Sequence, residues 1–270
     1  MYITRNATSV SESGLRYDKS YTGFQATMTC GRKVGEFDCC SVVEGNNITV
    51  LRTLPECVDI VITSPPYNLG NNHHTGNKRV QAYTDYLPEA EYQDKQKELL
   101  ACLFKITKKE GSLFYNHKNR ISKGISISPY LWIFRTPWIV KQELVWFNGS
   151  QNFDKIRFYP MTERVYWLAK DSHTKLENNI NHHDYFSKSD WPPVKTGGHH
   201  ARAFPEKMVA DVLSCFPLSN FVLDPYCGSG TSLAVAKSMN RHFLGIEIEP
   251  KYVAIARQRL ADIPFVVETV

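Results

Sequence analysis

The feature that most constrains the fold of this chain is a short apolar run that leads directly into a glycine-rich turn and a helix. Residues 220–224 read Asn-Phe-Val-Leu-Asp, and the turn that follows contains Gly228 and Gly230. Helical periodicity then occupies residues 233–239. An apolar run of this length, bounded by a turn, is typical of a buried parallel strand. The segment therefore predicts a strand, a tight turn and a helix, with Asp224 at the carboxyl end of the strand.

The same alternation of strand and helix recurs along the chain. Residues 58–63 form a nearly continuous apolar run, and residues 88–109 place leucines at helical spacing before a strand predicted over 111–115. The remaining predicted elements are a helix over 205–215, a strand over 242–247 and a helix over 252–260. Strands that alternate with helices imply an α/β fold with a mostly parallel, doubly wound, Rossmann-like sheet covered on both faces.

Composition narrows the class of protein. Hydrophobic residues make up 42% and charged residues 22% of the 270 residues, which is ordinary for a globular enzyme with a sizeable core. The net charge of +5 permits a nucleic-acid partner without requiring one. The seven cysteines form no Cys-x-x-Cys pair, and neither a signal peptide nor an apolar run long enough for a membrane span is present. We therefore expect a reduced, cytoplasmic protein with no membrane partner.

The turn after Asp224 favours a particular kind of ligand. Gly228 and Gly230 leave no side chain between the backbone and a bound molecule. An acid at the end of the strand repels phosphate but attracts an ammonium or sulfonium group, and Glu247 follows at the spacing that dinucleotide folds use to bind ribose hydroxyls. These features suit S-adenosyl-L-methionine. A tight turn without any ligand is the alternative for this segment alone.

A second unusual segment follows the strand at 58–63 and reads Ser-Pro-Pro-Tyr. Ligands of doubly wound sheets lie beyond the carboxyl ends of the strands, so this loop should face the same cleft as the glycine-rich turn. Pro65 and Pro66 remove backbone donors, and we expect their carbonyls to have nothing local to pair with. Outside this position, the tetrapeptide would be read as a plain turn or a polyproline segment.

Such a loop suits transfer of a methyl group to an exocyclic amine. The lone pair of that amine is delocalised into the ring, and hydrogen bonds from its N–H groups to fixed acceptors favour the geometry in which the lone pair points at a methyl group. Proximity to a sulfonium supplies much of the remaining acceleration. The target base lies inside a duplex, so it must be flipped out, and we expect it to stack on Tyr67.

These two segments together resemble the amino-methyltransferases of bacterial restriction–modification systems. The resemblance is to the permuted β class, in which the catalytic loop precedes the cofactor loop, and it covers residues 40–115 and 199–260, with a weaker match over 144–170. It implies a circularly permuted S-adenosylmethionine-dependent methyltransferase fold, double-stranded DNA as substrate and a bacterial or phage origin. It also implies a cognate restriction endonuclease as functional partner, with the chain working as a monomer or homodimer.

The resemblance assigns roles to individual residues. The residues implied to grip the target base are Ser64, Pro65, Pro66 and Tyr67. The residues implied to bind the cofactor are Asp224, Pro225, Tyr226, Gly228, Gly230, Thr231, Glu247, Phe204, His200 and Asn46. Two positions depart from the common pattern. Residues 44–46 read Glu-Gly-Asn where the family often has Gly-Asp, and the catalytic tetrapeptide begins with Ser, which in this family usually accompanies N4-cytosine rather than N6-adenine methylation.

We divide the chain into four parts: an N-terminal arm (1–35), a catalytic half (36–116), a target-recognition region (117–198) and a cofactor-binding half (199–270). The recognition region is aromatic and basic, so its cations are suited to phosphates and its aromatics to opened bases, although aromatics that alternate in short strands are equally typical of a core. The predicted DNA-binding residues are Lys78, Arg79, Lys141, Lys155, Arg157 and Arg164.

The sequence leaves several alternatives to the leading interpretation. N6-adenine methylation differs only in the base that the pocket accepts. RNA and protein-glutamine methyltransferases share a similar loop but place the cofactor turn first in sequence. A non-catalytic DNA-binding homologue would have lost one of the two loops, and both are intact. No metal site is predicted, because the histidine pairs at 73–74, 182–183 and 199–200 consist of adjacent residues that do not readily share a tetrahedral ion.

Overall fold

The structure is a computed structural model of the 270-residue chain. It describes the backbone of two short paired strands, β1 (Ser9–Val10) and β2 (Arg16–Tyr17), and then residues 30–69, 86–149, 156–178, 183–193 and 204–264. The predicted site residues His200, Lys78, Arg79 and Lys155 lie outside the described residues.

An eight-stranded sheet forms the centre of the described structure. Its strands lie in the order β12 (Tyr185–Phe186), β10 (Ile139–Phe147), β11 (Thr162–Ala169), β7 (Thr107–His117), β6 (Val58–Thr63), β13 (Phe221–Asp224), β14 (His242–Glu247) and β5 (Ser41–Glu44). Strand β11 pairs antiparallel with both of its neighbours, and the other pairings in this sheet are parallel. The predicted mostly parallel α/β sheet is confirmed.

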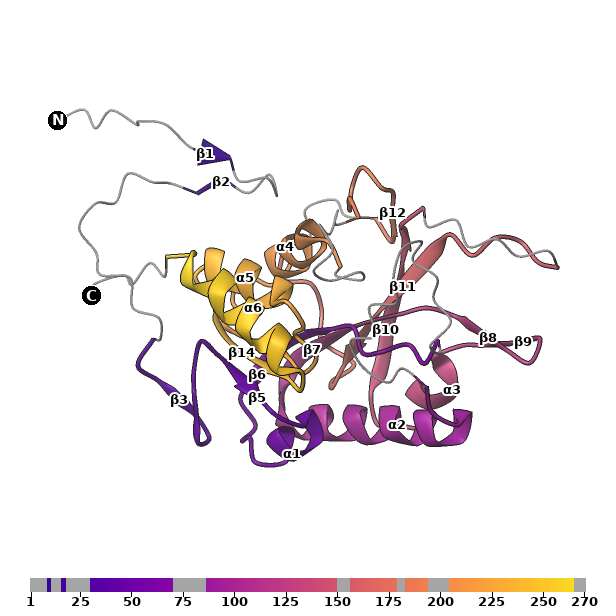
Figure 1. The fold of residues 1–270 in the computed structure, drawn as a ribbon, viewed down its shortest axis with the longest axis horizontal. Coiled ribbons are helices and arrows are strands. Elements are labelled where there is room, and N and C mark those ends of the chain that lie inside the picture. Colours follow the sequence, from indigo (N-terminus) through magenta and orange to yellow (C-terminus); the bar gives the residue numbers. More distant parts are fainter. Residues whose placement is uncertain are drawn as a thin grey trace.

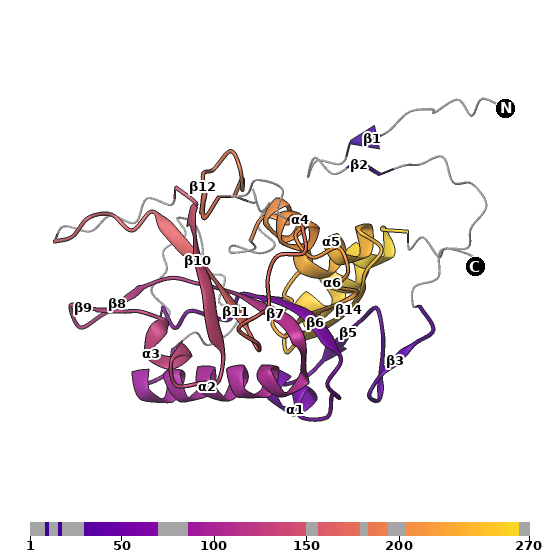
Figure 2. The ribbon, with the colours of Figure 1, turned by 180° about the vertical axis from the view of Figure 1, so that it is seen from behind.

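Helices cover the sheet on both faces (Figures 1 and 2). On one face lie α4 (Glu206–Ser214), α5 (Thr231–Ser238) and α6 (Pro250–Ala261). On the other lie α1 (Asn47–Leu51), α2 (Glu89–Ile106) and α3 (Tyr130–Ile133). The central strands are buried on both sides, which explains why they read as continuous apolar runs rather than as alternating patterns. None of the helices in the described ranges has the length and apolarity that a membrane span requires.

The segment assigned to target recognition does not form a separate sheet. Strands β10 and β11 continue the central sheet beyond β7, and Trp146 and Trp167 on them are buried core residues. Two hairpins stand apart from the sheet. Strands β3 (Lys33–Val34) and β4 (Phe37–Asp38) precede the edge strand β5, and strands β8 (Arg120–Ser122) and β9 (Ile125–Ile127) follow the carboxyl end of β7.

Candidate active site

The two loops singled out by the sequence lie side by side. Strands β6 and β13 are parallel neighbours, with Val61 opposite Leu223, so their carboxyl ends leave the same edge of the sheet. Thr63, the last residue of β6, is fully buried and lies beside Asp224, the last residue of β13. Its hydroxyl makes no hydrogen bond of standard geometry within the described part of the chain. The expectation that both loops face one cleft agrees with this pairing.

Asp224 is a buried carboxyl group at the centre of this edge. Only 1% of the residue is exposed, and this burial raises its pKa to about 6. The charge of Glu247 raises the pKa further, whereas hydrogen bonds from Ser232 Oγ and the Tyr226 backbone N–H, and the nearby Thr63 hydroxyl, lower it. Burying an ionised carboxylate lowers the stability of the fold. A buried carboxyl group whose pKa is raised toward neutrality is therefore typical of a functional site.

The turn after Asp224 leaves backbone close to this carboxyl group. Gly228 has φ 50° and Gly230 has φ 80°, a left-handed conformation that side chains rarely adopt. Gly230 is also the N-cap of α5, and a Cβ there would lie 3.1 Å from the Cβ of Ala256 on α6. Thr231 begins α5 and is buried. Gly230 therefore lets the turn and the start of α5 approach α6 closely.

Glu247 and Arg259 hold the glycine-rich turn in place. The Gly228 N–H donates to Glu247 Oε2 at 2.9 Å, and the other oxygen of Glu247 accepts from two backbone N–H groups that follow it, both at 2.9 Å. Burial raises the pKa of Glu247, and these backbone donors oppose the rise. Arg259 donates to Ser229 O at 3.4 Å and to Thr231 Oγ1 at 3.1 Å. Sequence reasoning assigned no role to Arg259, because only the fold brings α6 against the turn.

The other described residues predicted to bind the cofactor differ in their surroundings. Asn46 is the N-cap of α1, and its Oδ1 accepts from the Thr49 N–H at 3.2 Å. Asn47, which sequence reasoning missed, reaches across to the Pro225 carbonyl at 3.3 Å. Tyr226 is half-buried in the turn, and Phe204 is buried just before α4. The structure thus brings Asn46 to the same sheet edge as the turn, in a capping role.

The predicted catalytic loop, residues 64–67, is held by hydrogen bonds that meet at the Tyr67 hydroxyl. It lies 2.8 Å from Ser64 Oγ, 2.7 Å from Asn116 Oδ1 and 3.1 Å from Glu163 Oε2. Asn116 donates its Nδ2 to the Arg164 carbonyl at 3.0 Å, which turns its oxygen toward Tyr67. The Tyr67 hydrogen therefore points at these acceptors, and Ser64 must donate its own hydrogen to Tyr67. This direction leaves the lone pairs of Ser64 Oγ as acceptors.

The Pro66 carbonyl, for which no local partner was expected, is paired by a side chain from a distant part of the sequence. Tyr92 on α2 donates its hydroxyl to the Pro66 carbonyl at 2.8 Å and lies 2.7 Å from His117 Nε2. Burial lowers the pKa of His117 to about 3, so the imidazole is neutral, and its Nδ1 accepts the Lys118 N–H. The Pro65 carbonyl accepts no hydrogen bond from any described residue. Sequence reasoning missed Tyr92 and His117 because helix α2 and strand β7 meet the loop only in the fold.

The ring of Tyr67 is packed inside the protein. It is 6% exposed, and its centroid lies 4.6 Å from that of His117 at an interplanar angle of 39°. Asn68, with φ 54°, exchanges two hydrogen bonds with the backbone of Leu87, at 2.7 and 3.0 Å. The Tyr67 ring, on which the target base was predicted to stack, thus already contacts the His117 imidazole.

The predicted DNA-binding cations that are described do not form one patch. Arg164 is half-buried in β11, where its Nε contacts Glu143 Oε1 at 2.7 Å. Lys141 donates to the Ser172 carbonyl at 2.7 Å, at the far end of β10 from the catalytic loop. Arg157 donates to the Gly124 carbonyl at 2.9 Å and so joins its own loop to the hairpin β8–β9. Of these three cations, Arg157 is the one in the loop that precedes β11.

Exposed apolar side chains gather where that hairpin meets the loop before β11. Because β7 ends at His117 and β11 begins opposite it, both segments lie beyond the carboxyl end of the sheet, as the catalytic loop does. Phe158 is fully exposed. The other large apolar residues that are exposed there are Ile121, Ile125, Ile156 and Tyr159. We call this surface, residues 121–125 and 156–159, the recognition edge.

Comparison with known proteins places this geometry in context. A family model described as DNA methylase matches residues 58–258. The type II methyltransferase M.BglII of Bacillus subtilis is 27% identical over 259 residues, which cover 83% of this chain and 69% of that protein. The type II methyltransferase M.ScaI of Streptomyces caespitosus is 25% identical over 252 residues, which cover 80% and 79% of the two chains.

Solved structures share the fold. The PvuII DNA methyltransferase, which is cytosine-N4-specific, matches with a TM-score of 0.64 and 21% identity, covering 85% of this chain and 87% of its own. The complex of M1.HpyAVI with SAM matches with a TM-score of 0.55 and 20% identity, covering 81% and 98%. The predicted fold class and family resemblance are therefore confirmed. Since the family model matches well over half of this chain, the chain belongs to the N6/N4 DNA methylase family.

Proposed function

We propose that this protein methylates N4 of cytosine in double-stranded DNA, with S-adenosyl-L-methionine as methyl donor. Membership of the DNA methylase family supports transfer to an exocyclic amine of a base. Ser64 at the head of the catalytic loop and the likeness to the cytosine-N4-specific PvuII enzyme favour cytosine over adenine. The observation that carries the proposal is the pair of adjacent acceptors, Ser64 Oγ and the Pro65 carbonyl, next to the Asp224 turn.

The residues around Asp224 fit the cofactor. A buried carboxyl group, two glycines with positive φ and a second acid at the end of β14 together suit a molecule that carries an ammonium, a sulfonium and ribose hydroxyls. Asp224 would hold the cationic end, and Glu247 the ribose. When bound, the cofactor supplies an electrophilic methyl group on its sulfonium. M1.HpyAVI, which has the same fold, was crystallised with SAM.

The catalytic loop positions the amine. Because Ser64 donates its hydrogen to Tyr67, its oxygen accepts one N–H of the amine, and the Pro65 carbonyl accepts the other. These two hydrogen bonds weaken conjugation of the amine lone pair with the base ring and direct that lone pair toward the methyl group of the cofactor. Tyr92 holds the loop in this shape through the Pro66 carbonyl.

The same contacts offer a route for the proton that the amine must lose after methyl transfer. The route runs from Ser64 Oγ through the Tyr67 hydroxyl to Glu163 Oε2 at 3.1 Å. Neutral His117 does not compete for this proton, because burial holds its pKa near 3. Glu163 is therefore the carboxylate nearest to the reacting group along this route.

The recognition edge would contact the substrate. Exposed aromatic and aliphatic side chains beyond the carboxyl end of the sheet are suited to wedging between base steps and stabilising an extruded base. Arg157 in the same loop is suited to phosphate. The relatives M.BglII and M.ScaI are type II methyltransferases, which supports a restriction endonuclease as the functional partner of this chain.

Mass spectrometry of nucleosides tests the proposal. The purified chain is incubated with S-adenosylmethionine and genomic DNA that lacks base methylation, and we expect N4-methylcytosine. N6-methyladenine instead would refute the choice of cytosine while leaving the amino-methyltransferase chemistry intact. Absence of both modified bases from a whole genome of potential sites would refute the activity.

A matched pair of variants tests the role of Ser64. We expect Ser64→Ala to lower the single-turnover rate by about tenfold or more, since the lost hydrogen bond is worth about 1–2 kcal/mol in a dry site. Cofactor affinity should be unchanged. Ser238→Ala on α5, whose hydroxyl contacts only the Val235 carbonyl among the described residues, is the control and should match the wild type. An equal rate for Ser64→Ala would remove Ser64 from the mechanism.

A further inference from the structure

Four potential metal ligands meet at the end of the sheet opposite the active site. Cys30 precedes β3, Cys39 and Cys40 join β4 to β5, and His242 is the first residue of β14. Their ligand atoms all lie within 4.8 Å of one another. Ser41 and His242 begin parallel strands whose carboxyl ends carry Glu44 and Glu247, so this group is separated from the cofactor turn by the length of the strands.

The three distances among Cys39, Cys40 and His242 match the edges of a tetrahedral metal site, and Cys30 lies within reach of the same ion. Cys39 Sγ and Cys40 Sγ are 3.7 Å apart, and His242 Nδ1 lies 3.5 Å from the first and 3.7 Å from the second. With zinc–sulfur bonds of about 2.3 Å and zinc–nitrogen bonds of about 2.0–2.1 Å, the edges of a tetrahedron measure about 3.8 Å between sulfurs and about 3.5 Å between sulfur and nitrogen. From this geometry we propose that Cys30, Cys39, Cys40 and His242 bind a structural zinc ion.

The backbone explains how adjacent cysteines can share one ion. Cys40 has φ 61°, a left-handed conformation that is uncommon for a residue with a side chain. It directs the Cys40 sulfur to the same side as that of Cys39, and the Cys40 N–H is held by the Phe243 carbonyl at 2.8 Å. A disulfide would need sulfurs about 2.05 Å apart, so the pair is arranged for a ligand rather than for a bond.

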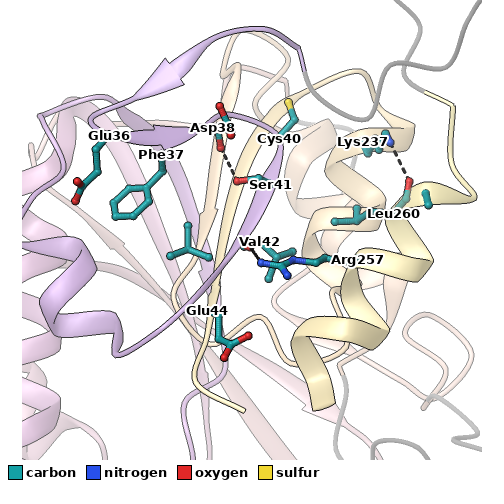
Figure 3. Close-up of a pocket in the computed structure, with 12 residues that line it drawn as sticks. Glu36, Phe37, Asp38, Cys40, Ser41, Val42, Glu44, Lys237, Arg257 and Leu260 are labelled. Carbon is teal, nitrogen blue, oxygen red and sulfur yellow. Dashed lines mark hydrogen bonds between the residues drawn. The ribbon is translucent and has the colours of Figure 1, made fainter. Parts of the chain in front are cut away.

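The surroundings suit the charge of such a site. Zinc with three thiolates and a neutral imidazole carries one net negative charge. Lys237 is buried and lines the same cavity of about 520 Å³ as Cys40, between β5 and α6 (Figure 3). Arg32 is exposed and lies 3.2 Å from His242 Nε2. With Nδ1 bound to the metal, His242 Nε2 carries the imidazole proton and cannot accept a hydrogen bond. Arg32 can then turn toward the thiolates instead.

The ion would fasten residues 30–40 to the sheet. Apart from the cysteines, this segment packs only the buried Val34 and the half-buried Phe37 against the core, so little apolar surface holds the hairpin β3–β4 against β14 and the edge strand β5. A zinc ion shared between the hairpin and His242 supplies that attachment, because the free energy of binding becomes free energy of folding. Three thiolates and one imidazole favour zinc over harder divalent ions.

Metal analysis of the whole protein tests this inference. The full chain is purified in reductant without a chelator, and elemental mass spectrometry after gel filtration should find one zinc per chain. Replacement of the ion by cobalt(II) should produce thiolate-to-cobalt charge transfer and the visible bands of a tetrahedral centre. Substoichiometric zinc, a different metal in its place, or an octahedral cobalt spectrum would overturn the proposal, as would a Cys39–Cys40 disulfide in the reduced preparation.

Two cysteine variants provide the matched comparison. Cys30 and Cys57 are both half-buried, but only Cys30 belongs to the group. We expect Cys30→Ser to weaken zinc binding by at least about 100-fold, more than the loss of an outer-shell partner costs. Cys57→Ser should retain the ion as the wild type does. Equal zinc retention by Cys30→Ser, with an unchanged far-ultraviolet circular dichroism spectrum, would exclude Cys30 as a ligand and overturn the four-residue site.

Discussion

The pH dependence of cofactor binding follows directly from the burial of Asp224. The pKa of this carboxyl group is about 6, well above its ordinary value of 3.8. If the ionised form holds the cationic end of S-adenosylmethionine, affinity must fall as the pH drops through this value. The ionised fraction is about 0.9 at pH 7 and about 0.1 at pH 5, so the dissociation constant should rise roughly tenfold between them.

The effect of the Asp224 pKa on folding stability does not interfere with the binding measurement. Because the folded pKa of Asp224 is raised, the folded chain holds this proton more tightly than the unfolded chain does. The contribution of this group to stability is therefore present at low pH and lost as the pH rises through about 6. Acidification from pH 7 to pH 5 does not unfold the protein through Asp224, and weaker binding there cannot be attributed to its destabilisation.

Titration calorimetry at constant ionic strength measures the effect, with two variants to separate the acids. Asp224→Asn should bind at least about tenfold more weakly at pH 7, since a charge-assisted hydrogen bond is worth about 1.5–3 kcal/mol, and its affinity should vary little with pH. Glu247→Gln should retain the dependence, although the pKa of Glu247 is also raised. A dependence that survives in Asp224→Asn but vanishes in Glu247→Gln would refute the reasoning.

Three further predictions concern the catalytic loop, the packing of the turn and the recognition edge. Tyr92→Phe removes the donor to the Pro66 carbonyl and should slow single turnover by about tenfold at unchanged cofactor affinity. Gly245→Ala places a Cβ against Leu233 and should lower the free energy of unfolding in urea by about 1–3 kcal/mol; an unchanged midpoint would contradict this packing. Phe158→Ala should leave stability unchanged because the side chain is fully exposed, but weaken DNA binding in a gel-shift titration by about fivefold or more.

Much of the fold was predictable because its signals are local. The strands predicted over 58–63, 220–224 and 242–247 are β6, β13 and β14, whose observed bounds differ from the predicted ones by at most one residue. Each is buried on both faces and therefore carries an uninterrupted apolar pattern. Strands β10 and β11 were harder to place, since short aromatic segments are equally compatible with a core and with an exposed reading surface. The structure assigns Trp146 and Trp167 to the core and leaves Phe158 outside.

The residues of the site likewise divide into those that local sequence patterns reveal and those that only the fold brings together. Ser64, Tyr67, Asp224 and Glu247 could be named from the sequence, because each lies at the end of an apolar run, where parallel sheets collect their ligands. Their partners could not. Tyr92, Asn116 and Glu163 reach the catalytic loop from other elements of the fold, and no spacing along the chain reports those contacts.

By itself, the sequence determined the central strands β6, β13 and β14, the helices that follow them, the two loops and the family resemblance, since these depend on local pattern and on short motifs. The tertiary structure alone decided which acceptors remain available. It assigned the Pro66 carbonyl to Tyr92 and left the Pro65 carbonyl without a donor among the described residues. It also gathered Cys30, Cys39 and Cys40 around His242, some two hundred residues away. Hydrogen bonding and metal coordination depend on distance and direction in space, and only the packed chain sets these.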